Sequence, residues 1–115
     1  MRVVDLLNNA DASITQLGVY ETESGQDMRW SISVTSSGIN GIPKIYIEES
    51  LDNIYWSARK NNTPNGILDY FLLDDIVVTI RDSYFMGKYI RIRVEPNGTT
   101  TGSVSAKLGV KTKSN

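Results

Sequence analysis

The sequence predicts an all-β protein, an antiparallel β-sandwich or jelly roll of about seven or eight strands with little or no helix. The first observation is a two-residue alternation of apolar and polar side chains, the period of a strand with one buried face. The second is the clusters of Gly, Pro and Asn between these runs, at spacings of roughly 8–12 residues that are typical of a sandwich. The third is size, because 115 residues with 40% hydrophobic side chains suffice for one small core.

The alternation places the strands along the chain. The clearest strands are expected over residues 28–35, 44–48, 54–59, 89–95 and 103–111. Weaker strands are expected over 13–20, where a bulge near Gly18 would explain the broken pattern, and over 67–73 and 76–80. Residues 1–12 are expected to form an N-terminal arm, and residues 13–115 a single sandwich domain.

Both tryptophans are expected in the core. Trp30 shares its phase of the alternation with Ile32, and Trp56 shares its phase with Ile54. Large aromatic side chains on the inner face of a strand contribute strongly to a small core. We therefore expect Trp30 and Trp56 to be buried between the sheets.

The charge and the missing residue types exclude several functions. With 12 Lys and Arg against 13 Asp and Glu, the net charge is −1, which disfavours general binding to nucleic acid. The chain has no Cys, which excludes disulfides, zinc ribbons and thiol nucleophiles. It has no His, the commonest general base and metal ligand. We expect no enzymatic activity and no cofactor.

Paired carboxylates are the remaining candidates for a metal site. Glu48-Glu49 and Asp74-Asp75 are such pairs, but adjacent residues of a strand point to opposite faces and cannot chelate together. The spacing of an EF-hand loop is missing as well. We therefore expect solvated charges at turns or edges, and no metal.

The sequence also argues against a membrane partner. Its longest apolar runs are far shorter than the roughly 18 residues that a spanning helix needs. The first residues lack the apolar stretch of a secretory signal, so we expect synthesis in a cytoplasm.

A series of landmarks extends over residues 28–110. These are Trp30-Ser-Ile-Ser-Val34, Lys44-Ile-Tyr-Ile-Glu48, Ser50-Leu-Asp-Asn-Ile-Tyr-Trp56, Tyr89-Ile-Arg-Ile-Arg-Val94 and Gly98-Thr-Thr-Thr-Gly102. Their order resembles a group of small bacteriophage virion proteins of β-sandwich type. The run S-x-D-x-x-x-W followed by Y-I-R-I is also similar to discoidin-like (galactose-binding-like) jelly rolls. In either case Ser50 and Asp52 can bond backbone N–H groups in a tight turn.

A basic strip is the first candidate interface. If 89–95 and 103–111 pair as a hairpin, Arg91 or Arg93 lies opposite Lys107, and like charges opposite each other are unfavourable. Either a carboxylate such as Glu48 on a neighbouring strand neutralises the strip, or an acidic partner surface does.

Aromatic and apolar residues extend this candidate interface. Tyr46, Tyr55 and Tyr89 fall on the polar phase of their strands, and Tyr and Arg are enriched at interface cores. The N-terminal arm would dock onto a neighbour through Val3, Val4, Leu6 and Leu7.

The resemblance to virion proteins implies a non-enzymatic structural protein of a bacteriophage, made in the host cytoplasm and located in the virion. It would decorate or cement the capsid, or sit in the head, collar or tail. Its partners would be the major capsid protein, other virion proteins or further copies of itself in a homo-oligomer. The alternative is a carbohydrate-binding module for host attachment, with Trp56 or the three tyrosines in contact with the sugar.

Overall fold

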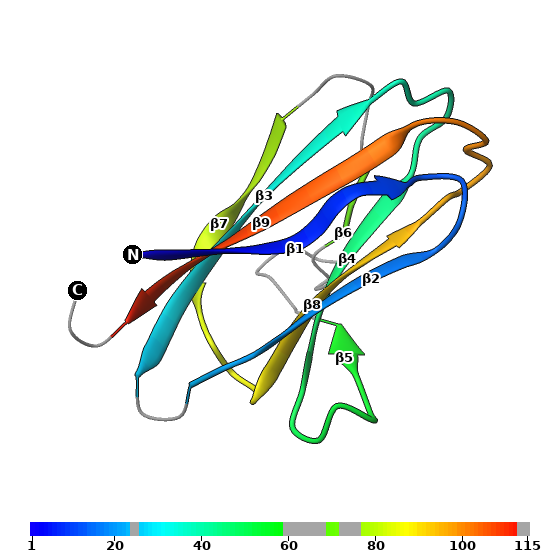
Figure 1. The fold of residues 1–115 in the computed structure, drawn as a ribbon. Helices are drawn as coiled ribbons and strands as arrows, with labels where there is room; N and C mark the ends of the chain where they lie inside the picture. The colour runs from blue at the N-terminus through cyan, green and yellow to red at the C-terminus, as the bar shows by residue number, and fades with distance from the viewer. Residues whose placement is uncertain (24–25, 59–68, 72–76, 113–115) are drawn as a thin grey trace.

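The computed structural model describes residues 1–23, 26–58, 69–71 and 77–112, which form two antiparallel sheets (Figure 1). The strands are β1 (Arg2–Asp11), β2 (Gln16–Glu21), β3 (Asp27–Ser37), β4 (Lys44–Ser50), β5 (Ser57–Ala58), β6 (Asp69–Phe71), β7 (Val77–Tyr84), β8 (Tyr89–Glu95) and β9 (Ser103–Thr112). This part of the chain contains no helix, and hence none that is long and apolar enough to cross a membrane. The all-β sandwich is confirmed. The expected count of seven or eight strands is wrong: the described residues form nine strands, because residues 2–11, expected in an N-terminal arm, form β1, which pairs with β9.

Consecutive long strands alternate between the two sheets. Sheet A has the order β1-β9-β3-β7, and sheet B has the order β2-β8-β4-β5, with β6 also paired to β4. The two sheets lie face to face in Figure 1, and each connection from β1 to β4 crosses from one sheet to the other. The long strands that pair are therefore not consecutive in sequence.

The expected hairpin of residues 89–95 and 103–111 is wrong. Strand β8 pairs with β2 and β4 in sheet B, whereas β9 pairs with β1 and β3 in sheet A. The connection between them contains Asn97, Gly98 and Gly102, all at positive φ. These left-handed conformations let the chain turn from one sheet to the other, since Gly and Asn tolerate them better than other residues do.

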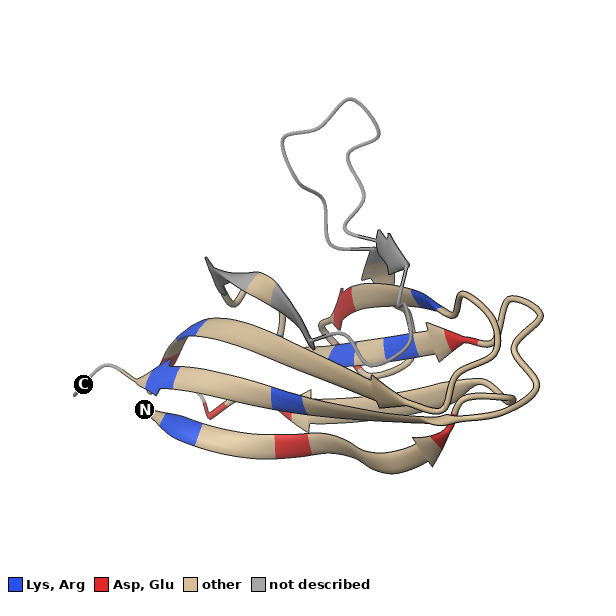
Figure 2. Ribbon diagram, turned by 90° about the horizontal axis from the view of Figure 1, so that it is seen from above, with Lys and Arg blue, Asp and Glu red and all other residues tan. Residues whose placement is uncertain are grey.

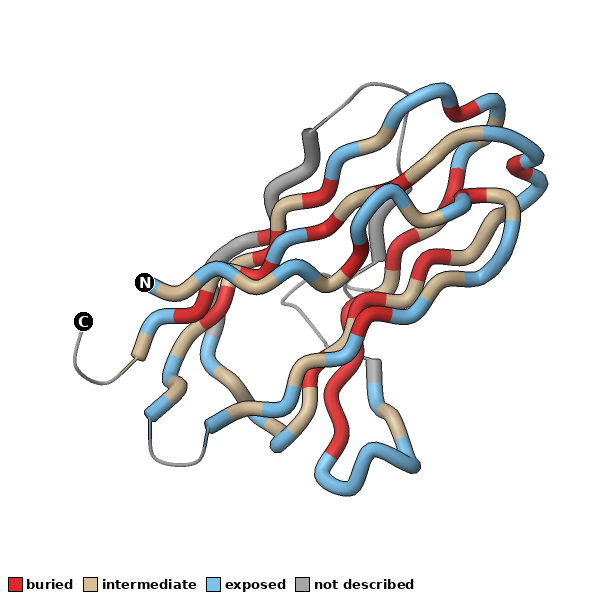
Figure 3. Tube along the Cα trace, in the orientation of Figure 1, coloured by how far each residue is buried: buried red, intermediate tan, exposed pale blue. Residues whose placement is uncertain are grey.

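The core lies between the sheets and follows the predicted alternation. Figure 3 shows buried positions alternating with more exposed ones along β3, β8 and β9, and the same alternation holds in β4 up to Ile47, after which Glu48, Glu49 and Ser50 are all buried. Trp30 is fully buried, as predicted. The other fully buried large side chains are Ile32, Val34, Ile45, Ile47, Ile80, Ile90, Ile92, Val94, Val104 and Leu108.

The N-terminal segment is not a separate arm. Strand β1 pairs with β9 from Arg2 opposite Val110 to Asp11 opposite Ser103, so the sandwich begins at its first residues. Register shifts along β1 accompany the burial of Leu7 against the core. Arg2 also donates a hydrogen bond to Asp27 at 3.0 Å, which ties β1 to β3. The apolar side chains of 1–12 therefore serve mainly the fold.

Gly18 marks a close approach rather than the expected bulge. The pairing of β2 with β8 runs through Gly18 opposite Ile92 without a shift. A Cβ atom at this position would lie 2.5 Å from the carbonyl oxygen of Leu6. The absence of a side chain at Gly18 lets β1 and β2 pack against each other at this edge of the sandwich.

Candidate functional site

The outward surface of sheet B carries most of the candidate residues. Since the isoleucines of β4 and β8 point inward, the residues between them point outward. We call this surface the sheet B face; its members from β4 and β8 are Lys44, Tyr46, Glu48, Tyr89, Arg91, Arg93 and Glu95. The structure thus brings four of the predicted interface residues together, namely Tyr46, Tyr89, Arg91 and Arg93.

Glu48 joins the two arginines of the sheet B face. Its Oε1 accepts hydrogen bonds from Nε of Arg91 at 2.8 Å and from Nε of Arg93 at 3.0 Å. Burial acts to raise the pKa of Glu48, but the hydrogen bonds from Arg93 and Arg91 outweigh it and hold the pKa below its ordinary value. The first alternative for the basic strip is therefore confirmed, because a carboxylate on a neighbouring strand pairs with the arginines.

Arg93 is the more fully paired arginine. Its Nη1 donates to Glu95 Oε1 at 2.7 Å, and its Nη2 lies 3.3 Å from Glu48 Oε2. Glu95 also accepts from Thr15 at 2.7 Å, and these hydrogen bonds from Arg93 and Thr15 lower the pKa of Glu95. The side chains of the sheet B face are thus held in one arrangement.

Two aromatic rings lie against the arginines. The guanidinium carbon of Arg93 is 4.1 Å from the ring centroid of Tyr46, and that of Arg91 is 4.2 Å from the ring centroid of Trp56. These are cation–π contacts, which orient both partners. The sheet B face therefore combines flat apolar rings with planar hydrogen-bond donors.

Trp56 does not lie in the core, so this prediction was wrong. It is half-buried at the end of the segment 51–56, which forms no strand, and Ile54 is 71% exposed. The turn explains the difference, because Ser50 Oγ accepts from the amides of Asp52 and Asn53. Asp52 Oδ1 accepts from the amides of Ile54 and Tyr55, at 2.9 Å each. Side-chain hydrogen bonds replace strand pairing here.

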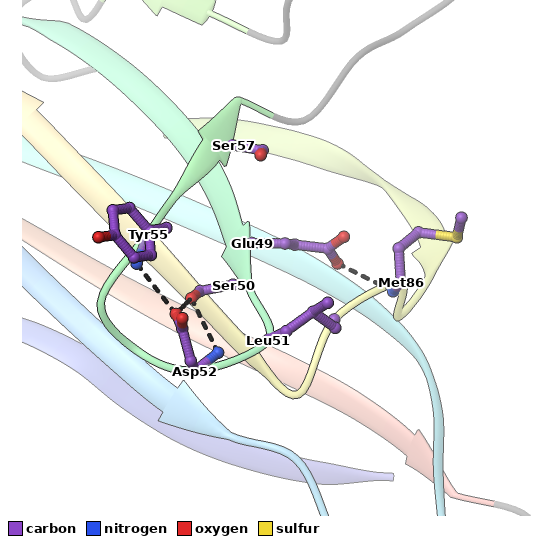
Figure 4. A pocket seen from close by; sticks show the side chains of 8 residues that line it. Glu49, Ser50, Leu51, Asp52, Tyr55, Ser57 and Met86 are labelled. Atoms are coloured by element: carbon purple, nitrogen blue, oxygen red, sulfur yellow. Dashed lines mark hydrogen bonds between the residues drawn. The ribbon is translucent and has the colours of Figure 1, made fainter.

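A hollow of about 380 Å³ adjoins this turn (Figure 4). Its lining residues are Glu49, Ser50, Leu51, Asp52, Tyr55, Ser57, Met86 and Gly87. Figure 4 shows Glu49 directed toward Met86, whose amide donates to Glu49 Oε1 at 3.1 Å. The predicted interface residue Tyr55 lines this pocket and is 80% exposed.

An aliphatic strip borders the sheet B face on β2. Leu17 lies opposite Arg93 and Val19 lies opposite Arg91 in the β2–β8 register. Both are exposed in spite of their size. The arginines consequently lie between aliphatic side chains on one side and aromatic rings on the other.

The remaining predicted residues lie elsewhere. Lys107 is exposed on β9 of sheet A, opposite Asp5 of β1 and Ser33 of β3, so it does not belong to the strip of Arg91 and Arg93. Figure 2 shows that charged positions occur on both sheets.

The apolar residues of β1, which were predicted to contact a neighbour, differ in their exposure to solvent. Val3 is exposed, Val4 and Leu6 pack partly against the core, and Leu7 is buried.

Sequence reasoning treated Trp56 as core and did not associate it with Arg91. The sequence signal for the position of Trp56 outside the core was the turn formed by the side chains of Ser50 and Asp52. The Glu48-Glu49 pair points to opposite faces, with Glu48 toward Arg91 and Glu49 toward the pocket, as alternation requires. Both carboxylates are buried, so the expectation of solvated charges is wrong for this pair. Asp74-Asp75 lies outside the described residues. Within the described segments, no group of three or more acidic residues is arranged to hold a metal ion.

Comparisons with known proteins give two similar solved structures. The first is the crystal structure of PirA, with a TM-score of 0.48 and 9% sequence identity. The match spans 95% of this chain and 91% of the PirA chain. The second is a CBM4 carbohydrate-binding module, with a TM-score of 0.43 and 11% sequence identity. The match spans 96% of this chain and 70% of the CBM4 chain. No family model and no curated protein matches the sequence.

Proposed function

We propose that this chain is a carbohydrate-binding β-sandwich module that binds a glycan on the sheet B face. The observation that carries the proposal is the pair of aromatic rings, Tyr46 and Trp56, each held against an arginine of one surface. An aromatic ring offers a flat apolar surface to the C–H face of a sugar, and arginine and glutamate bond sugar hydroxyl groups. The proposal is of binding without catalysis.

Preorganisation supports this proposal. Ordering flexible side chains on binding costs about 0.5–1.5 kcal/mol for each one. The Glu48 bridge already fixes Arg91 and Arg93, and the turn at Asp52 already fixes the segment that carries Trp56. A glycan would therefore meet a surface whose side chains are largely ordered.

The strand order supports the finer description of the fold as a jelly roll. Such folds have two sheets formed by interleaved antiparallel strands. Here β1, β3, β7 and β9 belong to sheet A, while β2, β4 and β8 belong to sheet B. The virion role, its capsid or self-associating partners and its localisation stay predictions from the sequence resemblance and are separate from this proposal.

The test is a screen of the purified protein against a glycan array and soluble polysaccharides. We expect saturable binding that the changes Trp56→Ala and Tyr46→Ala each reduce at least tenfold. Tyr84→Ala is the matched control, because it removes an exposed tyrosine from sheet A. Lack of binding to any glycan, or equal losses in all three variants, would refute the proposal.

A further inference from the structure

The two arginines of the sheet B face differ in how many of their donors are used. Arg93 uses Nε and Nη2 toward Glu48 and Nη1 toward Glu95. Arg91 donates only through Nε, to Glu48 Oε1 at 2.8 Å. Within the described part of the chain, nothing accepts from the two terminal amino groups of Arg91.

The carboxylates of the sheet B face are also shared unevenly between the two arginines. One oxygen of Glu48 serves both arginines, and Glu95 pairs with Arg93 and Thr15. The guanidinium group stays charged at every ordinary pH. Arg91 therefore keeps positive charge and hydrogen-bond donors on the side that faces away from Glu48.

Arg91 is also held in position. Its side chain is 17% exposed, and its guanidinium group lies 4.2 Å from the ring centroid of Trp56. Val19 occupies the register position across from it on β2. A fixed planar fork with unused donors fits a carboxylate, which accepts two parallel charge-assisted hydrogen bonds.

We propose that the glycan bound on the sheet B face carries a carboxylate, as uronic and sialic acids do, and that Arg91 recognises it. This inference rests on the proposed function. The sugar ring lies against the Trp56 side of the face, and its carboxylate meets the two terminal amino groups of Arg91. Hydroxyl groups at the same place accept weaker hydrogen bonds, because only the donor and not the acceptor is charged, so Arg91 makes the site selective.

The test uses ligand pairs that differ only in the carboxylate. One pair is a galacturonic acid oligomer and its carboxyl-reduced counterpart, and the other is sialyllactose and its carboxyl-reduced counterpart, so that the two pairs separate the two sources of carboxylate. Titration calorimetry should show at least tenfold tighter binding of the acidic member of one pair. Its dissociation constant should rise between 0.1 M and 1 M salt, as the Debye length falls from ~10 Å to ~3 Å.

Variants assign the preference to Arg91. We expect Arg91→Gln to abolish the preference for the acidic member and Lys107→Gln, which removes one positive charge from sheet A, to leave it intact. Arg91→Lys keeps the charge but loses the fork, so it should reduce the preference at least threefold and serves if Arg91→Gln fails to fold.

The outcomes separate the two proposals. Equal affinity for both members of both pairs would overturn the carboxylate proposal and leave glycan binding intact. An unchanged preference in a folded Arg91→Gln or Arg91→Lys protein would overturn the role of Arg91. Binding to none of these ligands and to no other glycan would overturn the proposed function as well.

Discussion

Replacing Glu48 by Gln tests the central bridge of the sheet B face. The change keeps the shape of the side chain but removes the charge that both Arg91 and Arg93 contact. Glu48 is 7% exposed, so its loss leaves two guanidinium groups without their shared carboxylate in a poorly solvated place. The folded protein should lose stability relative to the unfolded chain.

The structure gives the size of this loss. Removing one partner of a fully buried ion pair costs about 3–5 kcal/mol. The side chains of Arg91 and Arg93 are 17% and 26% exposed, so water compensates in part. We expect Glu48→Gln to lower the free energy of unfolding by about 2–3 kcal/mol, or Tm by about 8–12 °C for a domain of this size.

The pH dependence gives an independent check. The pKa of Glu48 is lowered in the folded protein, so its stabilisation is present above the unfolded pKa of about 4.3 and is lost as the pH falls through the lower folded value. Urea unfolding of both proteins, followed by tryptophan fluorescence from pH 7 to pH 2, should show a constant difference above about pH 4.5 that shrinks below it.

The control is Asp5→Asn, which removes an exposed carboxylate from β1 and should change stability by less than about 0.5 kcal/mol. An equally small effect of Glu48→Gln at pH 7 would refute the reasoning. So would a difference that grows as the pH falls.

Three further predictions concern packing and the turn. Trp30→Ala should lower the free energy of unfolding by about 3–5 kcal/mol, whereas Trp56→Ala should lower it by about 1 kcal/mol, because only Trp30 is fully buried; urea unfolding measures both. Gly18→Ala should cost about 1–3 kcal/mol by the same measurement, since its Cβ would meet the carbonyl of Leu6 at 2.5 Å, and an unchanged midpoint would contradict this packing. Asp52→Ala should speed hydrogen exchange of the two amides bonded to its carboxylate while amides of β3 keep their rates; equal rates in both proteins would show that the turn does not depend on this side chain.

The sequence predicted the core strands well because their alternation reflects burial on one face. Trp30, Ile45, Ile92 and Val104 all point inward as the period requires. The same period at Ile54 and Trp56 misled the prediction, because hydrogen bonds from Ser50 and Asp52 fold this segment into a turn. Periodicity over three apolar positions is too short to outweigh a specific turn.

Pairing between strands was much harder to predict. Alternation shows which residues of β8 and β9 point inward, but it does not show which strands lie beside them. Arg91 and Lys107 were placed together on the assumption that neighbours in sequence pair, and the two strands lie in different sheets. The sequence could suggest that a carboxylate such as Glu48 on a neighbouring strand pairs with the arginines. It could not show which strand lies beside β8 or which atoms form the hydrogen bonds.

The pairing of β1 with β9 has a consequence for how the molecule folds. Asn9 and Ser105 are hydrogen-bonded although they are 96 positions apart, and sheet A is built from such distant partners. Chains rich in non-local contacts fold slowly, in milliseconds to seconds, because a large loop must close before its pairing is rewarded. During synthesis β1 and β3 cannot pair with β9 until β9 has left the ribosome, and until then their unpaired edges and incompletely packed apolar side chains favour aggregation.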